Sequence, residues 1–248
     1  MLKLIGDVKY GKLPSEIQTH LTASSSNDEK IRMLVIVILF LDIICGIPLF
    51  VNGNIVFSMI ALPLIIAINL WTIIVMFLSP GDRNDIHFTL YQGGVWGVIS
   101  LCYFVLSQKY AHSVLSYNLL FISTSFITYF IMTLGFFRYF LIVFPNYKKK
   151  KIGTPAWGTY LLTIGSGIGY ITAQIVFHFG DSVSNLFMSY IYLMLACTFS
   201  YMGVMFIHKF FFIKANRDII DKHLQRGKTV SDRGARRRNE KIRGEPPC

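Results

Sequence analysis

A chain of 248 residues that is 53% hydrophobic and only 15% charged does not have the composition of a soluble globular domain, in which about 25% of residues are charged. The mean hydropathy is +0.51, and the apolar residues fall in blocks of about 20 or more, which is typical of membrane-spanning helices. The net charge of +11 does not indicate nucleic acid, because the basic residues flank the apolar blocks, where they orient a membrane protein and contact anionic lipid headgroups.

The apolar blocks predict an all-α fold, a polytopic bundle of six transmembrane helices. The bundle occupies residues 31–213, between an N-terminal arm of residues 1–30 and a basic tail of residues 214–248. The length leaves no room for a second folded domain of ordinary size. The predicted spans are residues 31–51, 55–79, 87–107, 115–144, 156–179 and 185–213.

Two local signals precede the first span. Pro14 favours the start of a short helix that places Ile17 and Leu21 on one face. The simpler expectation for the arm is a loosely ordered segment that lies on the lipid headgroups. Ser26 and Glu29 match a capping box, so we expect the first spanning helix to begin just after Ser26.

The distribution of positive charge predicts the orientation. Six spans place both termini on one side, and all but two of the 24 Lys and Arg residues fall on that side; the two exceptions are Lys109 and Arg138. Cytoplasmic segments of membrane proteins carry the excess of Lys and Arg, so both termini are expected in the cytoplasm, with a bacterial plasma membrane as the expected location. The candidates for docking to anionic lipid or to a partner protein are Lys148, Lys149, Lys150, Lys151, Arg236, Arg237 and Arg238.

Three polar residues inside the spans are the candidate intramembrane site. Asp42 lies near the middle of the first span, where a carboxylate costs about 2.5–3.5 kcal/mol on insertion scales and is a functional candidate by default. Arg138 either extends to the cytoplasmic headgroups or forms a buried ion pair with Asp42. Asn69, in the second span, either bonds to a neighbouring helix or lines a polar path.

Small residues one helical turn apart predict close packing between helices. Gly93 and Gly97 form such a pair in the third span, and Gly165 and Gly169 form another in the fifth. The pattern allows helix backbones to approach each other, and it is common in membrane spans. It indicates tight packing without indicating a particular function.

No catalytic motif, metal-ligand spacing or phosphate-binding loop is present. The prediction is therefore a protein that is not an enzyme and has no cofactor. Haem is disfavoured because the histidines that could bind it lie at the ends of the spans. The cysteines are expected to be unpaired, since three lie within apolar spans.

Two functions remain open. The first is a non-enzymatic membrane protein that binds a partner, either as a subunit of a complex or as a protective protein of the immunity type. The second is a transporter or channel subunit that uses Asp42 as an ion or proton site, with Pro48 and Pro63 as hinges. We favour the first, because transporters show denser polar content across their spans.

Overall fold

A computed structural model describes residues 13, 15–22, 26–51, 54–78, 82–144, 178 and 180–220. Every regular element among these residues is a helix, which confirms the prediction of an all-α fold. Five of the described helices are long and apolar enough to cross a membrane, as the sequence predicts for a multi-pass protein. They cover Asn27–Phe50, Ile55–Phe77, Asp85–Leu115, Leu119–Ile142 and Asp181–Ala215.

The elements follow the predicted spans, with shifts of several residues at some ends. The first span is built from three consecutive segments, of which η2 has the wider turns of a π-helix. The predicted fifth span, residues 156–179, lies outside the described residues apart from His178. The elements are α1 (Ser15–Leu21), α2 (Asn27–Ile36), η2 (Val37–Gly46), α3 (Ile47–Phe50), α4 (Ile55–Phe77), α5 (Asp82–Leu115), α6 (Leu119–Arg138), η3 (Tyr139–Val143) and α8 (Asp181–Ala215).

The start of α2 confirms the predicted helix start and the Ser26 half of the capping box, while no bond from the Ser26 N–H to the Glu29 carboxylate is found among the described residues. The Ser26 hydroxyl accepts a hydrogen bond of 3.3 Å from the backbone N–H of Glu29. This bond satisfies one of the N–H groups that have no partner in the first turn of a helix. The first span therefore begins at Asn27.

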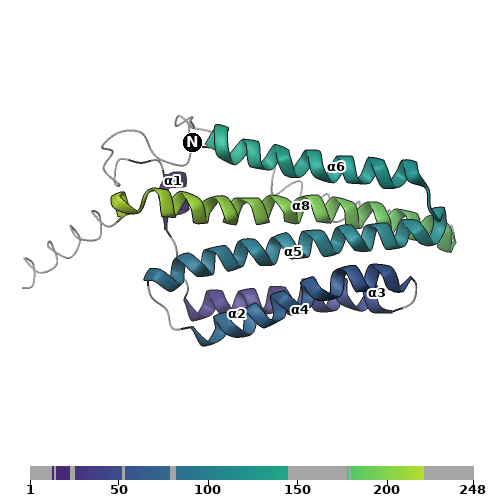
Figure 1. The fold of residues 1–248 in the computed structure, drawn as a ribbon, viewed down its shortest axis with the longest axis horizontal. Helices are drawn as coiled ribbons and strands as arrows, with labels where there is room; N and C mark the ends of the chain where they lie inside the picture. Colours follow the sequence, from purple (N-terminus) through teal and green to yellow (C-terminus); the bar gives the residue numbers. More distant parts are fainter. Residues whose placement is uncertain are drawn as a thin grey trace, which may run out of the picture.

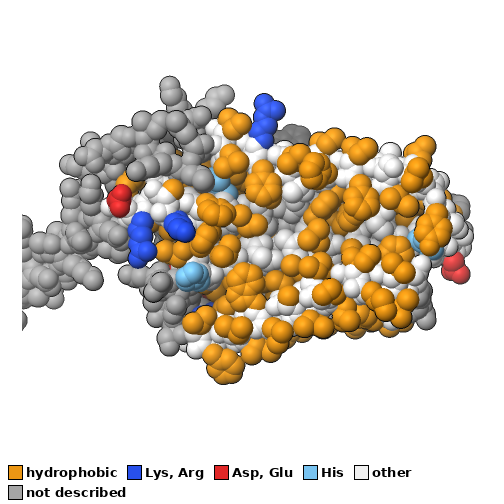
Figure 2. Space-filling view, viewed as in Figure 1, with side chains coloured by type: hydrophobic (Ala, Val, Ile, Leu, Met, Phe, Trp, Pro, Cys, Tyr) orange, Lys and Arg blue, Asp and Glu red, His pale blue; other side chains and the backbone are white. Residues whose placement is uncertain are grey.

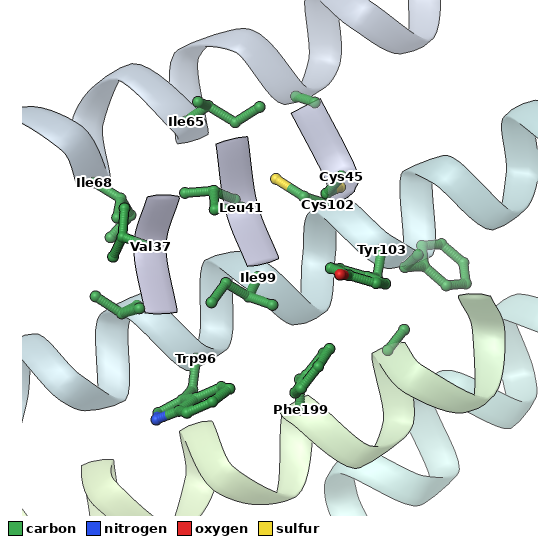
Figure 3. Packing of buried hydrophobic residues seen from close by; sticks show 14 of the residues in the cluster. Val37, Leu41, Cys45, Ile65, Ile68, Trp96, Ile99, Cys102, Tyr103 and Phe199 are labelled. Atoms are coloured by element: carbon green, nitrogen blue, oxygen red, sulfur yellow. The ribbon is translucent and has the colours of Figure 1, made fainter. Parts of the chain in front are cut away.

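The long helices α5 and α8 form the centre of the bundle and run antiparallel to each other (Figure 1). On one side, α6 packs against α8; on the other, α4 and the segment from α2 to α3 pack against α5. The main apolar core fills the space around α5, and Figure 3 shows Val37 and Leu41 of η2 facing Ile99 of α5, while Phe199 of α8 lies beside Tyr103. Helix α5 is thus the central helix, against which α8, α4 and η2 pack.

The backbones of α5 and α8 approach each other closely at glycines. A Cβ atom added to Gly93 would lie 2.8 Å from Cγ1 of Ile207, and one added to Gly203 would lie 3.0 Å from the backbone N of Gly97. These distances agree with the tight packing predicted for Gly93 and Gly97, and they identify Gly203 as the facing residue on α8. Gly165 and Gly169 lie outside the described residues.

Part of the N-terminal arm is an ordered helix, which differs from the loosely ordered arm that we expected. Helix α1 packs against α8, and the side chains of Ile17 and Leu21 are buried there with Phe212. These are the two residues that the sequence places on one face of a short helix. Their burial against Phe212 explains why this part of the arm is held on the bundle.

Candidate intramembrane polar site

Two of the three candidate polar residues are in direct contact. The side-chain amide of Asn69 donates a hydrogen bond of 2.9 Å from Nδ2 to Oδ1 of Asp42. Asp42 belongs to the π-helical segment η2 and Asn69 to α4, and both side chains are half-buried. The pair therefore joins two neighbouring spans at the edge of their contact, with part of its surface left open.

Three side-chain hydrogen bonds show that these two spans run antiparallel to each other. The Nζ atom of Lys30 bonds to the carbonyl of Leu78 at one end, and the hydroxyl of Ser58 donates to the carbonyl of Leu49 over 2.6 Å at the other. The Asp42–Asn69 bond lies between them. The carboxylate is thus placed near the middle of a helical hairpin, at a distance from both ends.

The surroundings of the pair are apolar and exposed. On α4, Asn69 falls on a row of exposed side chains separated by alternating steps of four and three residues. On α2 and η2, Asp42 lies in a second row, four residues after the exposed Ile38. We name these two rows together the α2–α4 face: Ile31, Val35, Ile38 and Asp42 on the first span, and Ile55, Met59, Leu62, Ile66, Asn69, Ile73 and Met76 on the second.

Arg138 is not part of this site. It lies exposed at the end of α6, which packs against α8, whereas Asp42 lies on the opposite side of α5 (Figure 1). Its position agrees with a side chain that extends toward the headgroups. The structure therefore joins Asp42 with Asn69 and separates both from Arg138.

Most other polar side chains between the spans are paired with one another. Thr72 bonds to Tyr91, and Gln108 donates to Ser125 over 2.9 Å. Such bonds between membrane helices are worth about 0.6 kcal/mol on average and serve packing. The remaining pairs between different helices are Ser100 with Tyr129, Ser107 with Ser189, and Thr133 with Ser200.

Two cavities lie near the end of the bundle where α5 turns into α6, and neither contains the Asp42–Asn69 pair. One has a volume of about 440 Å³ and apolar walls that include Phe104 and Phe121. The other, of about 720 Å³, lies beside Lys109. All three described hydrogen bonds of the Lys109 ammonium go to backbone carbonyls, those of Pro48, Leu49 and Val51.

A buried histidine pair at the opposite end of the bundle is not evident from the sequence. Nε2 of His20 in α1 lies 3.0 Å from Nδ1 of His208 in α8, inside a group of aromatic rings that includes Phe140 and Phe144. Burial, and secondarily the charges of His208 and Lys209, lower the pKa of His20 to about 3. The residues are 188 positions apart, and the only sequence signal is the amphipathic pattern of α1.

The described residues contain no cluster of three or more His, Cys, Asp or Glu side chains that would hold a metal ion. The basic residues predicted to dock to lipid or protein, Lys148 to Lys151 and Arg236 to Arg238, lie outside the described residues. Figure 2 shows that hydrophobic side chains cover the middle of the visible face, with most charged ones toward its ends. This distribution is the one expected for a protein whose middle lies in lipid.

Comparison of the chain with profiles of known protein families, with curated proteins and with solved structures finds no match. The function is therefore inferred from the geometry of the site.

Proposed function

We propose that this protein is a non-enzymatic, multi-pass membrane protein that acts by binding a partner protein in or at the membrane, as a subunit of a complex or as a protective protein. The observation that carries the proposal is the position of the Asp42–Asn69 pair. It lies at the exposed edge of two spans and lines neither of the two cavities that are formed by described residues.

A half-exposed carboxylate among apolar side chains is unfavourable against lipid. Oδ1 of Asp42 accepts a bond from Asn69, and no other side-chain bond to Asp42 is found among the described residues. Insertion scales put the cost of an aspartate near the middle of a span at about 2.5–3.5 kcal/mol. A partner that covers the pair and supplies a further hydrogen bond removes part of this cost, which gives Asp42 a role in recognition.

Transport is the second candidate function, with Asp42 as an intramembrane ion or proton site. Two observations favour it. Asp42 lies in a π-helical segment, and such segments are frequent at functional sites. The neighbouring helix α4 contains Pro63, which removes a backbone hydrogen bond and provides a hinge.

The topology that accompanies either function is six crossings with both termini in the cytoplasm. Phe144, after α6, contacts His208 and Phe212 near the end of α8, while Gly180 precedes the start of α8 at the other end of the bundle. The predicted span 156–179 falls between these two points in the sequence. Its position supports the count of six, and the basic segments then lie together against an anionic leaflet.

The test is purification of the full-length chain in mild detergent from the membranes in which it is made, followed by identification of proteins present in stoichiometric amount. A bound protein that is retained by Thr198→Val and lost with Asp42→Leu supports the proposal. Thr198 is a suitable control because it is exposed on α8 and, within the described part of the chain, bonds only to the carbonyl of Met194 in its own helix. A chain that purifies alone contradicts the proposal.

Flux measurements in liposomes decide the second candidate. If Asp42 is an ion or proton site, Asp42→Asn abolishes flux while the protein inserts at the normal level. Flux that is absent from the wild-type protein, or that survives the substitution, removes the transport interpretation based on Asp42.

A further inference from the structure

We infer that the α2–α4 face binds a transmembrane helix of another protein, and that this helix carries a lysine or arginine at the depth of Asp42. The inference deepens the proposed function and depends on it, since it specifies the chemistry of the partner.

The exposed residues of the α2–α4 face on α4 form one row that runs beside the buried row of this helix. Its buried residues, Ala61, Ile65, Ile68, Thr72 and Val75, follow steps of four and three, with α5 as the neighbour. The exposed row of the α2–α4 face is offset from this buried row by one residue and follows the same steps from Ile55 to Met76. Steps of four and three keep a row facing a second helix along its whole length.

Exposed apolar side chains alone would suit lipid equally well, and it is the polar pair that distinguishes this face. Asn69 is the single polar residue in the exposed row of α4, and Asp42 is the single acidic one in the row on α2 and η2. One polar residue in such a row fixes the register between packed helices. In lipid, polar side chains of this kind bond across helices.

The cation that would complement Asp42 is not supplied by the described part of this chain. The described basic groups along the hairpin do not pair with Asp42. Lys30 bonds to the carbonyl of Leu78 and Lys109 to the carbonyls that end α3. Arg32 is exposed near the start of α2, ten residues before Asp42, which is about 15 Å along a helix. Arg138 lies on the other side of the bundle. The sequence of residues 156–179 contains no Lys or Arg. Charge complementarity therefore indicates another protein as the source.

The role of Asp42 in this contact is recognition. Within the membrane, a carboxylate and a basic side chain at matched depth attract each other strongly, because the surroundings have a low dielectric constant. Asn69 holds Oδ1 and orients the carboxylate, so that Oδ2 is left for the incoming cation. A partner helix with an uncharged residue at this depth would leave the carboxylate unpaired and would be rejected.

The experiment uses the full-length protein in liposomes, with fluorescence energy transfer to synthetic transmembrane peptides. Each peptide is a Leu/Ala helix of about 20 residues with one central residue, either lysine, glutamine or leucine. We expect the lysine peptide to bind the wild-type protein about ten-fold or more tightly than the leucine peptide. Asp42→Asn should remove this preference, and Thr198→Val should preserve it.

Three results would overturn the inference. The first is a lysine preference that survives Asp42→Asn. The second is a glutamine peptide that binds as tightly as the lysine peptide, which would show a neutral hydrogen bond. The third is energy transfer between copies of this chain that is lost on Asp42→Asn, which would show that a second copy occupies the face.

Failure of the inference is distinguishable from failure of the proposed function. If native partner protein still co-purifies with Asp42→Leu, the partner binds elsewhere, and only the inference about the α2–α4 face is lost. A reciprocal pair provides a check against misfolding: Asp42→Lys should bind a peptide with a central aspartate better than one with a central lysine. Equal binding of these two peptides also contradicts the inference.

Discussion

Lys109 is one of the two basic residues that do not fit the predicted charge asymmetry, and the structure gives it a local role. Its ammonium donates to the carbonyls of Pro48, Leu49 and Val51 at 2.7, 2.9 and 3.1 Å. These carbonyls lie in and just after the last turn of the first span, where the ordinary helical donors are missing and the helix dipole is negative. The cation therefore caps α3 from a neighbouring helix.

We expect Lys109→Met to lower the free energy of unfolding by about 1.5–3 kcal/mol, the range for hydrogen bonds to a charged group. Methionine keeps an apolar stem of similar length, so the loss reports the capping bonds. The measurement is thermal unfolding in detergent. Lys214→Met, at an exposed position at the end of α8, is the matched control, and equal melting temperatures for the two variants would contradict the capping role.

His20 gives the docking of α1 a dependence on pH. Burial is the main cause that lowers its pKa from 6.5 to about 3. When α1 is undocked, His20 has its ordinary pKa. Between about pH 3 and pH 6.5, the undocked form therefore binds more protons than the docked form. The docking is therefore at full strength above pH 6.5 and weakens as the pH falls toward 3, by roughly 2 kcal/mol at about pH 5.

Amide hydrogen exchange of residues 15–22 as a function of pH measures this effect. Exchange corrected for its intrinsic rate should become faster below about pH 6. His20→Phe retains contacts with Phe140, Phe144 and Phe212 but binds no proton there, so its exchange should depend less on pH. The same pH profile in both proteins would exclude His20 as the cause.

At the scale of elements, α5 and α8 are held at a distance that only glycine allows. A Cβ atom on Gly203 would lie 3.0 Å from the N and 3.2 Å from the Cα of Gly97, which are backbone atoms that cannot move aside. Gly203→Ala should therefore destabilise the bundle by about 1–3 kcal/mol, the usual cost of overpacking. Unfolding in a graded mixture of mild and denaturing detergent measures the change.

Gly97→Ala is the control for this prediction, because its added Cβ would meet nothing within 4 Å. It makes the same chemical change on the facing helix and gains helix propensity, by up to about 1 kcal/mol. If both substitutions destabilise the protein equally, the effect is not due to the close approach at Gly203.

The elements show which part of the structure the sequence can predict. Hydropathy located the spans, since each described span is predominantly apolar, and capping chemistry located the start of α2. Hydropathy could not predict that α5 packs against α8, because the apolar surface of a membrane helix can pack against almost any other apolar helix. A signal was nevertheless present: Ala196, Ser200 and Gly203 form a row of small residues on α8, and all three are buried.

The candidate site was predictable in its members but not in its arrangement. Asp42 and Asn69 stand out as polar residues within spans, yet their hydrogen bond depends on the register of two antiparallel helices. The π-helical turns of η2 add to the difficulty, because they rotate Asp42 relative to an α-helical projection. The direction in which the pair faces, on which the proposed function depends, follows from tertiary packing alone.

For the whole molecule, the arrangement of the ends predicts which sites are reached from outside the cell. The turn from α5 to α6 and the start of α8 lie at one end of the bundle, while α1 and the end of α8 lie at the other (Figure 1). The charge asymmetry predicts that the second end lies in the cytoplasm. A cysteine at the α5–α6 turn should therefore face the exterior, and one at the end of α8 the interior.

A membrane-impermeant maleimide tests this orientation in intact cells. Cys45, Cys102 and Cys197 are buried and should not react, so a chain with Cys248→Ser is a suitable background. Tyr117→Cys, at a residue that is 79% exposed, should react in intact cells, whereas Lys214→Cys should react only after the membrane is permeabilised. The reverse result would place both termini outside, and the basic segments could then not serve as a cytoplasmic surface for anionic lipid.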